Sequence, residues 1–503
     1  WPQCFYSARG APTRRLPLLP HFWCSLTMVV GSLVNRCSMA RSMPLRRMLG
    51  ATRGMKIASA RPVNNGKQLD VEFTDKTTYR FHVEWMKDSS PAMVGTDYYR
   101  KSAKHLFDID KYVATEAKPS DDGSKLVVQF QNGTEAKTSD EYVSSWLHAF
   151  APHVGRPLHD QSAAVQSAGL QGTGSLLQQL KRSRQPWGAD LQIPTFDAGL
   201  LAVDEAMQIE FLERMTDPGV ALITGMEAPQ SLDNEDVGLP LERLVGNVIG
   251  RLNQHPVRST RYGVMKSRGS SEKSGADYDH SNPLSMHTDH SVYHGTPGYI
   301  QFMYQAQGCV TSKVCDGLAL AEAFREMHPE EFRLLTTVQL THSSRNCIYS
   351  KTGAYANAAM ADSAQFELVH THPVIELDAD GLLEKVVQSE TKRGVCALPF
   401  DMYEKYMAAY RLWTDLVEQP QYVHNFHWPE HSIIAMNNWR VMHGRAIVPP
   451  GMERTMCFGY VMKTIFENRY RLLRQRDAEK QDPAMSDKWL TRLPNQVLST
   501  LVR

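Results

Sequence analysis

Alternating apolar and polar positions predict a small antiparallel β domain in the first third of the chain. Apolar side chains recur at every second position over residues 69–73 and, after a polar turn, over 79–85. A period of two places these side chains on one face of a strand. Residues 126–130 form a further strand-like run, followed at 132–133 by an Asn-Gly pair that favours a two-residue hairpin turn. We therefore expect an antiparallel β domain over residues 66–152.

The rest of the chain mixes short strands with helices. Apolar runs bracketed by turn residues predict buried strands at 219–225, 299–304, 374–377 and 432–436. The stretch 153–190 is rich in Gln, Ser and Gly, and we interpret it as a linker or a surface helix. No GxGxxG, Walker or GxSxG motif stands at a strand end, so the corresponding nucleotide-binding and hydrolase classes are not indicated.

Two helices of this region have recognisable N-terminal signals. Asp316 can cap a helix that runs to Met327, and Asp401 with Glu404 three residues later resembles a capping box. The second helix has an aromatic stripe at helical spacing, which we interpret as core packing rather than a ligand site. The stripe consists of Tyr403, Tyr406, Met407, Tyr410, Trp413 and Val417.

Charge is unevenly distributed along the chain. The 503 residues contain 55 Lys and Arg against 54 Asp and Glu, but residues 1–69 contain eleven basic residues and no acid. The remainder therefore has 44 basic against 54 acidic residues, a net charge of −10. An acidic body lacks the basic excess that neutralises phosphates, so the charge argues against nucleic acid as a partner.

The first 65 residues have the composition of a targeting segment. They are rich in Arg, contain Ser and lack acids, as is typical of a mitochondrial presequence, so we expect a mitochondrial protein, with the cytoplasm as the alternative. The uncharged run 16–34 is interrupted by two prolines and a histidine, which disfavours a signal peptide or membrane span. No later uncharged apolar run approaches the roughly 20 residues of a span. The eight cysteines form no CxxC pair, and we expect reduced thiols.

Two histidines and one carboxylate form a candidate metal site. His287 and Asp289 stand two apart, so a strand would direct both side chains to one face. His443, just after the run at 432–436, is a third potential ligand. Such a set leaves three metal positions open, which suits non-haem Fe(II) that must bind a co-substrate and oxygen. Arg454, in a returning strand, can hold a carboxylate by a two-point contact.

Each of these residues also has an ordinary interpretation. With 19 His, a His-x-Asp pair is expected about once by chance. Taken alone, His287 is also consistent with a core or surface histidine whose hydrogen bonds are satisfied. Arg454 alone is consistent with a solvated arginine. His287, His290 and His294 form an alternative zinc-binding set. The ordered combination of triad, arginine and flanking strands favours iron.

Seven segments occur in an order that resembles a known family. They are YRFHVEWMKD (79–88), SSWLHAF (144–150), LSMHTD (284–289), TPGYIQF (296–302), NNWRVMHGRA (437–446), ERTMCFGY (453–460) and ENRYRLLRQR (467–476). Over residues 66–476 the chain resembles the γ-butyrobetaine dioxygenase and trimethyllysine dioxygenase family of Fe(II)/2-oxoglutarate-dependent, TauD-like oxygenases.

The resemblance implies a mainly β fold with helices, in which a distorted double-stranded β-helix (jelly roll) catalytic domain follows a small N-terminal antiparallel β domain. It implies that His287, Asp289 and His443 bind Fe(II). It also implies that Arg454 binds the distal carboxylate of 2-oxoglutarate, with O2 and ascorbate as further requirements. The expected divisions are a leader over 1–65, the small domain over 66–152, a linker over 153–190, the oxygenase domain over 191–476 and a tail over 477–503.

The chain departs from the family's pattern in two places. The family's N-terminal module binds structural zinc through three cysteines and a histidine, whereas no cysteine lies between residues 38 and 308 here. We therefore expect this module to rely on its hydrophobic core alone. The family also binds a trimethylammonium group in an aromatic cage. Tyr460 matches one cage position and Tyr278 is a second candidate substrate residue, but the rest of 267–282 lacks aromatic side chains. Glu390 is either a partner for a substrate cation or a solvated loop residue.

The resemblance predicts hydroxylation of a C–H bond in a small trimethylammonium amino acid or betaine, which is trimethyllysine or γ-butyrobetaine in carnitine biosynthesis. The sequence does not separate these two substrates. The alternatives are a 2-oxoglutarate oxygenase of another small molecule and a non-catalytic binding member of the family. The sequence predicts no membrane span in the mature protein, and it leaves a homodimer open.

Overall fold

The computed structural model describes nine stretches of the chain. They are residues 55–90, 109–158, 184–253, 261–267, 283–295, 298–344, 368–394, 398–449 and 451–481. Most of the predicted leader and linker, the candidate Tyr278 and the tail beyond residue 481 lie outside the described residues.

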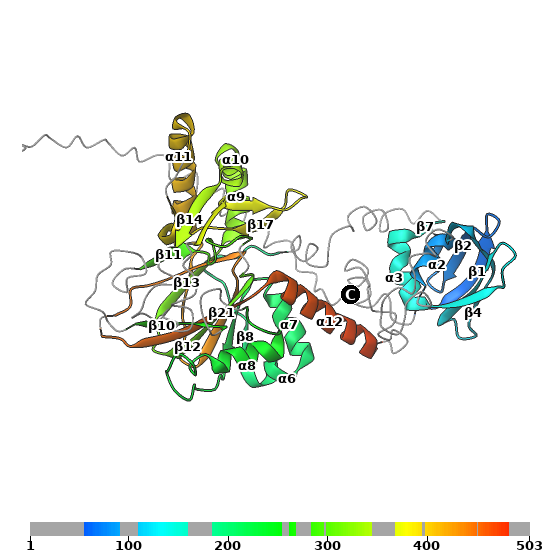
Figure 1. The fold of residues 1–503 in the computed structure, drawn as a ribbon, viewed down its shortest axis with the longest axis horizontal. Helices are drawn as coiled ribbons and strands as arrows, with labels where there is room; N and C mark the ends of the chain where they lie inside the picture. Colours follow the sequence, from blue (N-terminus) through cyan, green and yellow to red (C-terminus); the bar gives the residue numbers. More distant parts are fainter. Residues whose placement is uncertain are drawn as a thin grey trace, which may run out of the picture. The chain divides into compact units, whose positions relative to one another are not determined.

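Two antiparallel sheets form the small β domain (Figure 1, blue to cyan). The first has the order β1 (Ile57–Val63), β2 (Gln68–Phe73), β3 (Thr78–His82) and β7 (Arg156–Pro157), and the second has the order β4 (Tyr112–Pro119), β5 (Lys125–Asn132) and β6 (Thr138–Val143). The helical elements are α2 (Val83–Ser89), η4 (Ile109–Lys111) and α3 (Ser144–Val154). Leu69, Val71 and Phe73 are fully buried in one core, which confirms the predicted alternation along β2.

Three local predictions for this domain are wrong. β1 begins at Ile57, so the domain starts before residue 66; the strand was missed because only its first residue is fully buried. β3 ends at His82, and the following apolar positions begin α2. The turn after β5 spans residues 133–137. A two-residue type I′ turn requires a positive φ at both central positions, and within this turn only Gly133 has one.

A buried ion pair supplements the apolar core of the small domain. Lys87 Nζ lies 3.0 Å from Asp140 Oδ2, and the two side chains are 8% and 4% exposed. The same ammonium lies 4.9 Å from the ring centroid of Phe130. Trp85 stacks on Trp146, with ring centroids 5.7 Å apart. The expectation that the hydrophobic core alone stabilises this module is therefore incomplete, because the ion pair of Lys87 with Asp140 also connects α2 to β6.

We expect Lys87→Met to lower the unfolding free energy of the small domain by about 3–5 kcal/mol, because the Asp140 carboxylate would stay buried without a partner. Urea unfolding followed by tryptophan fluorescence measures the change. Replacing Asp140 by Leu as well should recover most of the loss, since no buried charge remains. The control is Lys125→Met, which breaks the exposed pair with Glu141 and should cost less than about 1 kcal/mol. Equal losses in Lys87→Met and the control would contradict the role of the buried pair.

The larger domain contains two main sheets (Figure 1). The six-stranded sheet has the order β10 (Gly263–Ser267), β21 (Arg454–Val461), β12 (Ile300–Gln307), β19 (Ser432–Asn437), β9 (Val220–Thr224) and β8 (Thr195–Asp197). The four-stranded sheet has the order β11 (Leu284–His287), β20 (Val441–Arg445), β13 (Thr311–Asp316) and β18 (His424–His427). Two two-stranded antiparallel sheets pair β14 (Leu340–Ser344) with β15 (Leu368–His372), and β16 (Ile375–Leu377) with β17 (Leu383–Val386).

Helices accompany these sheets. They are α6 (Ala198–Val203), α7 (Glu205–Arg214), α8 (Leu239–Val248), α9 (Gly317–Met327), α10 (Pro329–Thr337), η5 (Glu390–Lys392), α11 (Phe400–Val417) and α12 (Lys463–Gln481). Apolar side chains of α6, α7, α8 and α12 pack in one core with the six-stranded sheet. Figure 1 shows these helices together on one side of that sheet.

Strand β19 shows why the apolar runs predicted strands correctly. Ile433 and Ala435 lie in the core beneath the helices, whereas Ile434 and Met436 lie in a second core, shared with Val441 of the four-stranded sheet. A strand buried on both faces has a continuous apolar run instead of an alternating one. The predicted strands at 219–225, 299–304, 374–377 and 432–436 correspond to β9, β12, β16 and β19.

The helix signals were only partly right. Asp316 accepts a hydrogen bond from the Ala319 amide at the start of α9, as predicted. The predicted capping box at Asp401 is wrong, because α11 begins at Phe400 with Pro399 as its N-cap. Most of the aromatic stripe is buried in the core, although Tyr403 is 46% exposed.

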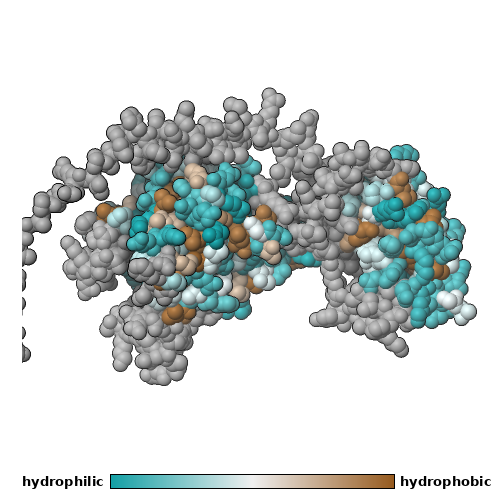
Figure 2. All heavy atoms as spheres, turned by 90° about the horizontal axis from the view of Figure 1, so that it is seen from above, coloured by the Kyte–Doolittle hydropathy of each residue, from teal (hydrophilic) through white to brown (hydrophobic). Residues whose placement is uncertain are grey.

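Two predicted boundaries of the larger domain also move outward. Residues 184–190 belong to the fold rather than to a linker, since the Trp187 indole donates a hydrogen bond to the carbonyl of Pro218. α12 continues to Gln481, five residues past the expected end of the domain. Among the described residues, none of the helices combines the length and the apolar character needed to cross a membrane. On the face seen in Figure 2, the described surface is largely hydrophilic, with apolar side chains scattered across it.

Candidate metal centre

Three potential metal ligands converge where β11 meets β20. His287 is the last residue of β11 and pairs directly with His443 in the middle of β20. The sequence predicted that His287 and Asp289 share one face of a strand. Asp289 instead lies two residues past the end of β11, so the following loop sets its position. One ligand atom from each side chain lies within 4.8 Å of the other two. Among the described residues, this is the group of three that converges, whereas the alternative set of His287, His290 and His294 does not.

The electrostatics of this group suit a divalent cation. His287 Nδ1 lies 2.9 Å from the carbonyl of Ser285. A carbonyl only accepts, so Nδ1 is the donor, and Nε2 faces Asp289 Oδ1 at 3.6 Å. Burial and the neighbouring His287 lower the pKa of His443 to about 3 against the opposing effect of Asp289. Burial alone would raise the pKa of Asp289, but His443, His287 and a hydrogen bond from Tyr460 lower it to about 2. A neutral imidazole at His443 and an ionised carboxylate at Asp289 are the forms that bind metal.

Side chains outside the predicted set hold Asp289 in place. The Asp289 amide donates to Asn438 Oδ1 at 2.8 Å, and Asn438 Nδ2 donates to the carbonyls of Asp289 and Gly298, both at 3.0 Å. Gln301 Nε2 and the Tyr460 hydroxyl each donate to Asp289 Oδ2 at 2.7 Å. Sequence reasoning missed Asn438 and Gln301, although both lie within the segments that carry the family resemblance. Metal ligands in proteins are usually oriented by outer hydrogen bonds of this kind.

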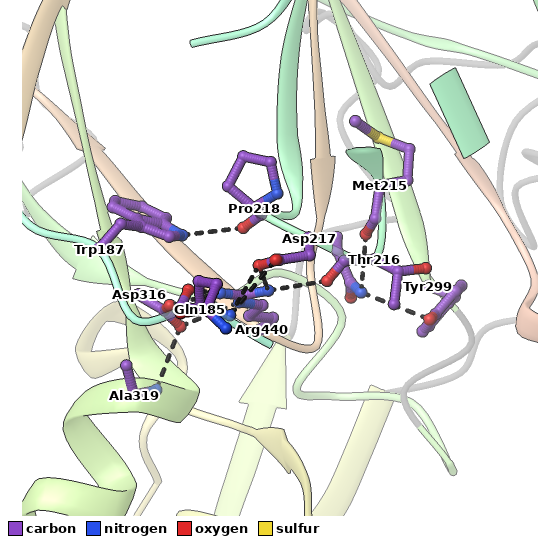
Figure 3. Close-up of polar contacts among 11 residues, drawn as sticks. Gln185, Trp187, Met215, Thr216, Asp217, Pro218, Tyr299, Asp316, Ala319 and Arg440 are labelled. Atoms are coloured by element: carbon purple, nitrogen blue, oxygen red, sulfur yellow. Dashed lines mark hydrogen bonds and ion pairs between the residues drawn. The ribbon is translucent and has the colours of Figure 1, made fainter. Parts of the chain in front are cut away.

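The β19–β20 turn, which precedes the strand that carries His443, is anchored by Arg440 (Figure 3). The guanidinium is fully buried and donates to both carboxylate oxygens of Asp316, at 2.7 and 3.1 Å. Its remaining contacts are with Asp217 Oδ1 and with the carbonyls of Thr216 and Gln185, at 2.7 to 2.9 Å. One side chain therefore joins the β19–β20 turn to the start of α9 and to two other segments.

Arg454, the predicted anion-binding residue, is buried in the larger domain. It is the first residue of β21, is 4% exposed, and donates to Gln305 Oε1 at 3.3 Å. Its guanidinium carbon lies 5.7 Å from the ring centroid of Trp428. Burial, with a smaller effect of Arg445, lowers its pKa to about 10. Within the described part of the chain Arg454 has no carboxylate partner, which favours an anionic ligand because a buried cation requires compensation.

The predicted substrate residues have internal partners. Tyr460 directs its hydroxyl at Asp289, and its ring centroid lies 3.8 Å from that of His290. Glu390 is paired with Arg393, whose Nε lies 2.9 and 3.1 Å from the two carboxylate oxygens. The suggestions that Glu390 awaits a substrate cation or is merely solvated are therefore both incomplete. Tyr278 is outside the described residues.

A mainly β fold that gathers two histidines and one carboxylate at adjoining strands is typical of mononuclear non-haem metal oxygenases. A family model described as "Taurine catabolism dioxygenase TauD, TfdA family" matches residues 179–460. The chain belongs to this family, and it is a 2-oxoglutarate-dependent dioxygenase.

Curated relatives are similar at low identity. The chain is 23% identical over 403 residues to a gamma-butyrobetaine dioxygenase from Pseudomonas sp. (strain AK-1), which covers 78% of this chain and 90% of that protein. It is 25% identical over 300 residues to the gamma-butyrobetaine dioxygenase of Homo sapiens, covering 58% and 70%. It is also 25% identical over 310 residues to "Trimethyllysine dioxygenase, mitochondrial" from Gallus gallus, covering 59% and 66%.

Proposed function

We propose that this enzyme hydroxylates a C–H bond of a small trimethylammonium amino acid or betaine, using Fe(II) held by His287, Asp289 and His443. The convergence of their three ligand atoms within 4.8 Å is the observation on which this proposal rests. The substrate class is supported by the printed names of the relatives, which include both gamma-butyrobetaine and trimethyllysine dioxygenases. Bound there, Fe(II) would supply the oxygen activation that couples decarboxylation of 2-oxoglutarate to substrate hydroxylation.

The strand order supports a double-stranded β-helix for the oxygenase domain, which we place at 191–476 with the outward extensions described above. β10, the first strand of the motif, pairs with β21, the last, and β11 pairs with β20, the last but one. β12 and β13 pair in turn with β19 and β18. Strands from the two ends of the domain thus alternate between two sheets, as in a jelly roll.

The chain's own residues have distinct roles in this reaction. His287, Asp289 and His443 would hold the metal, and three protein ligands would leave coordination positions for 2-oxoglutarate and O2. Arg454 binds the distal carboxylate of 2-oxoglutarate, and Arg445, buried two residues past His443 on β20, adds positive charge nearby. Ascorbate would act as the reductant that keeps the metal as Fe(II).

We expect Arg454→Gln to raise the KM for 2-oxoglutarate about 100-fold and to change kcat much less. Loss of a charge-assisted two-point contact removes about 3 kcal/mol of binding. Steady-state kinetics with varied 2-oxoglutarate measure this change. Arg454→Lys keeps the charge but loses the planar contact, so its KM for 2-oxoglutarate should lie between those of the wild type and Arg454→Gln. Arg243→Gln, at an exposed position on α8, is the control. An unchanged KM in Arg454→Gln would exclude the proposed contact.

Succinate release from 2-oxoglutarate tests the function directly. The enzyme is supplied with Fe(II), ascorbate and a panel of betaines and N-trimethyl amino acids, alongside equally sized amines that lack the trimethylammonium group. Stimulation by trimethylammonium compounds is expected. Stimulation by other small molecules alone would favour the second candidate function, which is an oxygenase of another substrate. The internal pairing of Glu390 with Arg393 is the observation that favours this second function. An absence of turnover with every compound would support a non-catalytic member.

A mitochondrial location is also part of the proposal. Its support is the acid-free composition of residues 1–65 and the printed name of the relative from Gallus gallus. Fractionation of cells followed by mass spectrometry of the mature N-terminus tests it, and a full-length chain in the cytosol would overturn it.

A further inference from the structure

One oxygen of Asp289 is occupied by two strong hydrogen bonds from neighbouring strands. Tyr460 on β21 and Gln301 on β12 each donate to Oδ2 at 2.7 Å. The two donors are directly paired across the β12–β21 ladder, so their side chains leave the sheet side by side on the same face. The position of both donors is therefore fixed by the register of the sheet rather than by flexible loops.

The orientation of the Gln301 side chain indicates that this arrangement serves the carboxylate. Gln301 is 1% exposed, and its Oε1 has no hydrogen-bond partner. An unsatisfied buried acceptor has a cost, and a flipped amide would place Oε1 against an acceptor-only carboxylate. Donation to Asp289 is the interaction that determines which way the amide faces.

A carboxylate oxygen has two lone-pair sites, and both sites of Oδ2 are used by these donors. Oδ1 accepts no hydrogen bond from Tyr460 or Gln301, and it is the oxygen that lies 3.6 Å from His287 Nε2. Oδ2 is 3.9 Å from His443 Nε2. The lone pairs available for a metal are therefore those of Oδ1.

We propose that Gln301 and Tyr460 are positioning residues that restrict Asp289 to a single metal-binding oxygen. The inference rests on the proposed function, in which a metal needs three open positions, two for the keto acid end of 2-oxoglutarate and one for O2. If Oδ2 were released, Asp289 could bind through both oxygens and would compete for one of those positions. Tyr460, which the resemblance assigns to substrate, thereby gains a second role through its hydroxyl.

The test uses the full chain loaded with Co(II), which mimics Fe(II) without reacting with oxygen. Tyr460→Phe and Gln301→Met each remove one donor, and the double variant removes both. Tyr304→Phe is the matched control, because the Tyr304 hydroxyl donates at 2.8 Å to the carbonyl of Glu227 and its ring packs in the core beneath the helices. Three quantities are measured: the Co(II) absorption spectrum, the dissociation constant for 2-oxoglutarate and the melting temperature.

The expected result has two parts. The Co(II) absorption of the variants should weaken before 2-oxoglutarate is added, as it does when a further oxygen joins the metal. The dissociation constant for 2-oxoglutarate should rise about 10-fold or more, and furthest in the double variant. Tyr304→Phe should match the wild type in both measurements.

Two results would overturn the inference while leaving the proposed function intact. One is wild-type-like Co(II) spectra and 2-oxoglutarate binding in the double variant. The other is weaker binding with an unchanged spectrum and a lowered melting temperature, which indicates a structural role only. If the wild-type chain binds no Co(II), or binds it equally well after His287→Ala, the proposed function itself fails, and the inference fails with it.

Discussion

Replacing His287 with alanine is expected to abolish 2-oxoglutarate turnover, with a loss of about three orders of magnitude or more. Such a loss corresponds to about 4 kcal/mol of transition-state stabilisation. His287 is one of three converging ligands, so its removal leaves two ligands and a weakly held metal. Succinate release measures the activity, and titration with Co(II) measures metal binding independently.

The matched control is His294→Ala. His294 lies seven residues further along, is exposed, and has its ring against that of His370 rather than against the triad. It should keep wild-type turnover and metal affinity. Loss of metal in His294→Ala would instead support the alternative zinc set suggested by the sequence. Retention of turnover in His287→Ala would contradict the metal centre.

Arg440→Met is expected to lower the unfolding free energy of the larger domain by about 3–5 kcal/mol. The substitution leaves the Asp316 carboxylate buried without its partner and removes donors to two backbone carbonyls (Figure 3). Urea unfolding measures the loss. The double variant Arg440→Met with Asp316→Asn should recover part of it, because the uncompensated charge is removed while the side-chain oxygen can still cap α9.

Arg325→Met on α9 provides the comparison for Arg440. Its ion pair with Glu322 is partly exposed, with the two side chains 30% and 50% accessible, so the expected loss is below about 1 kcal/mol. If Arg440→Met costs no more than this control, the buried network does not anchor the β19–β20 turn. Because Arg440 is three residues from His443, we also expect Arg440→Met to weaken Co(II) binding, whereas Arg325→Met should not.

The predicted strands that the structure confirms were predictable because their cause is local. The apolar side chains of β2 recur at every second position in one core, and those of β19 alternate between two cores, so both patterns are present in the sequence itself. The turn after β5 was less predictable, since backbone angles beyond Gly133 decided its length. Asp401 was mistaken for a cap because the helix already begins at Phe400, with Pro399 as its N-cap.

Some residues of the candidate site were predictable from the sequence, and others became evident only in the structure. His287, Asp289, His443 and Arg454 were identified from residue type, order and the family resemblance, and the structure brings the first three together. Asn438 and Gln301 have no signal of their own, because an amide residue is chemically unremarkable until its partner is known. Their contacts join positions 149 and 12 residues away from them in the chain.

The sequence by itself determined the small β domain, several buried strands and the identity of the candidate ligands, since side-chain chemistry and periodicity follow from residue order. Only the tertiary structure decided which oxygen of Asp289 remains available, because the register of β12 against β21 places Gln301 opposite Tyr460. It also decided that Lys87 and Arg440 are buried with carboxylate partners rather than solvated. The physical reason is that hydrogen bonds and charge pairs act over a few ångströms, and long-range folding alone sets which groups come within that distance.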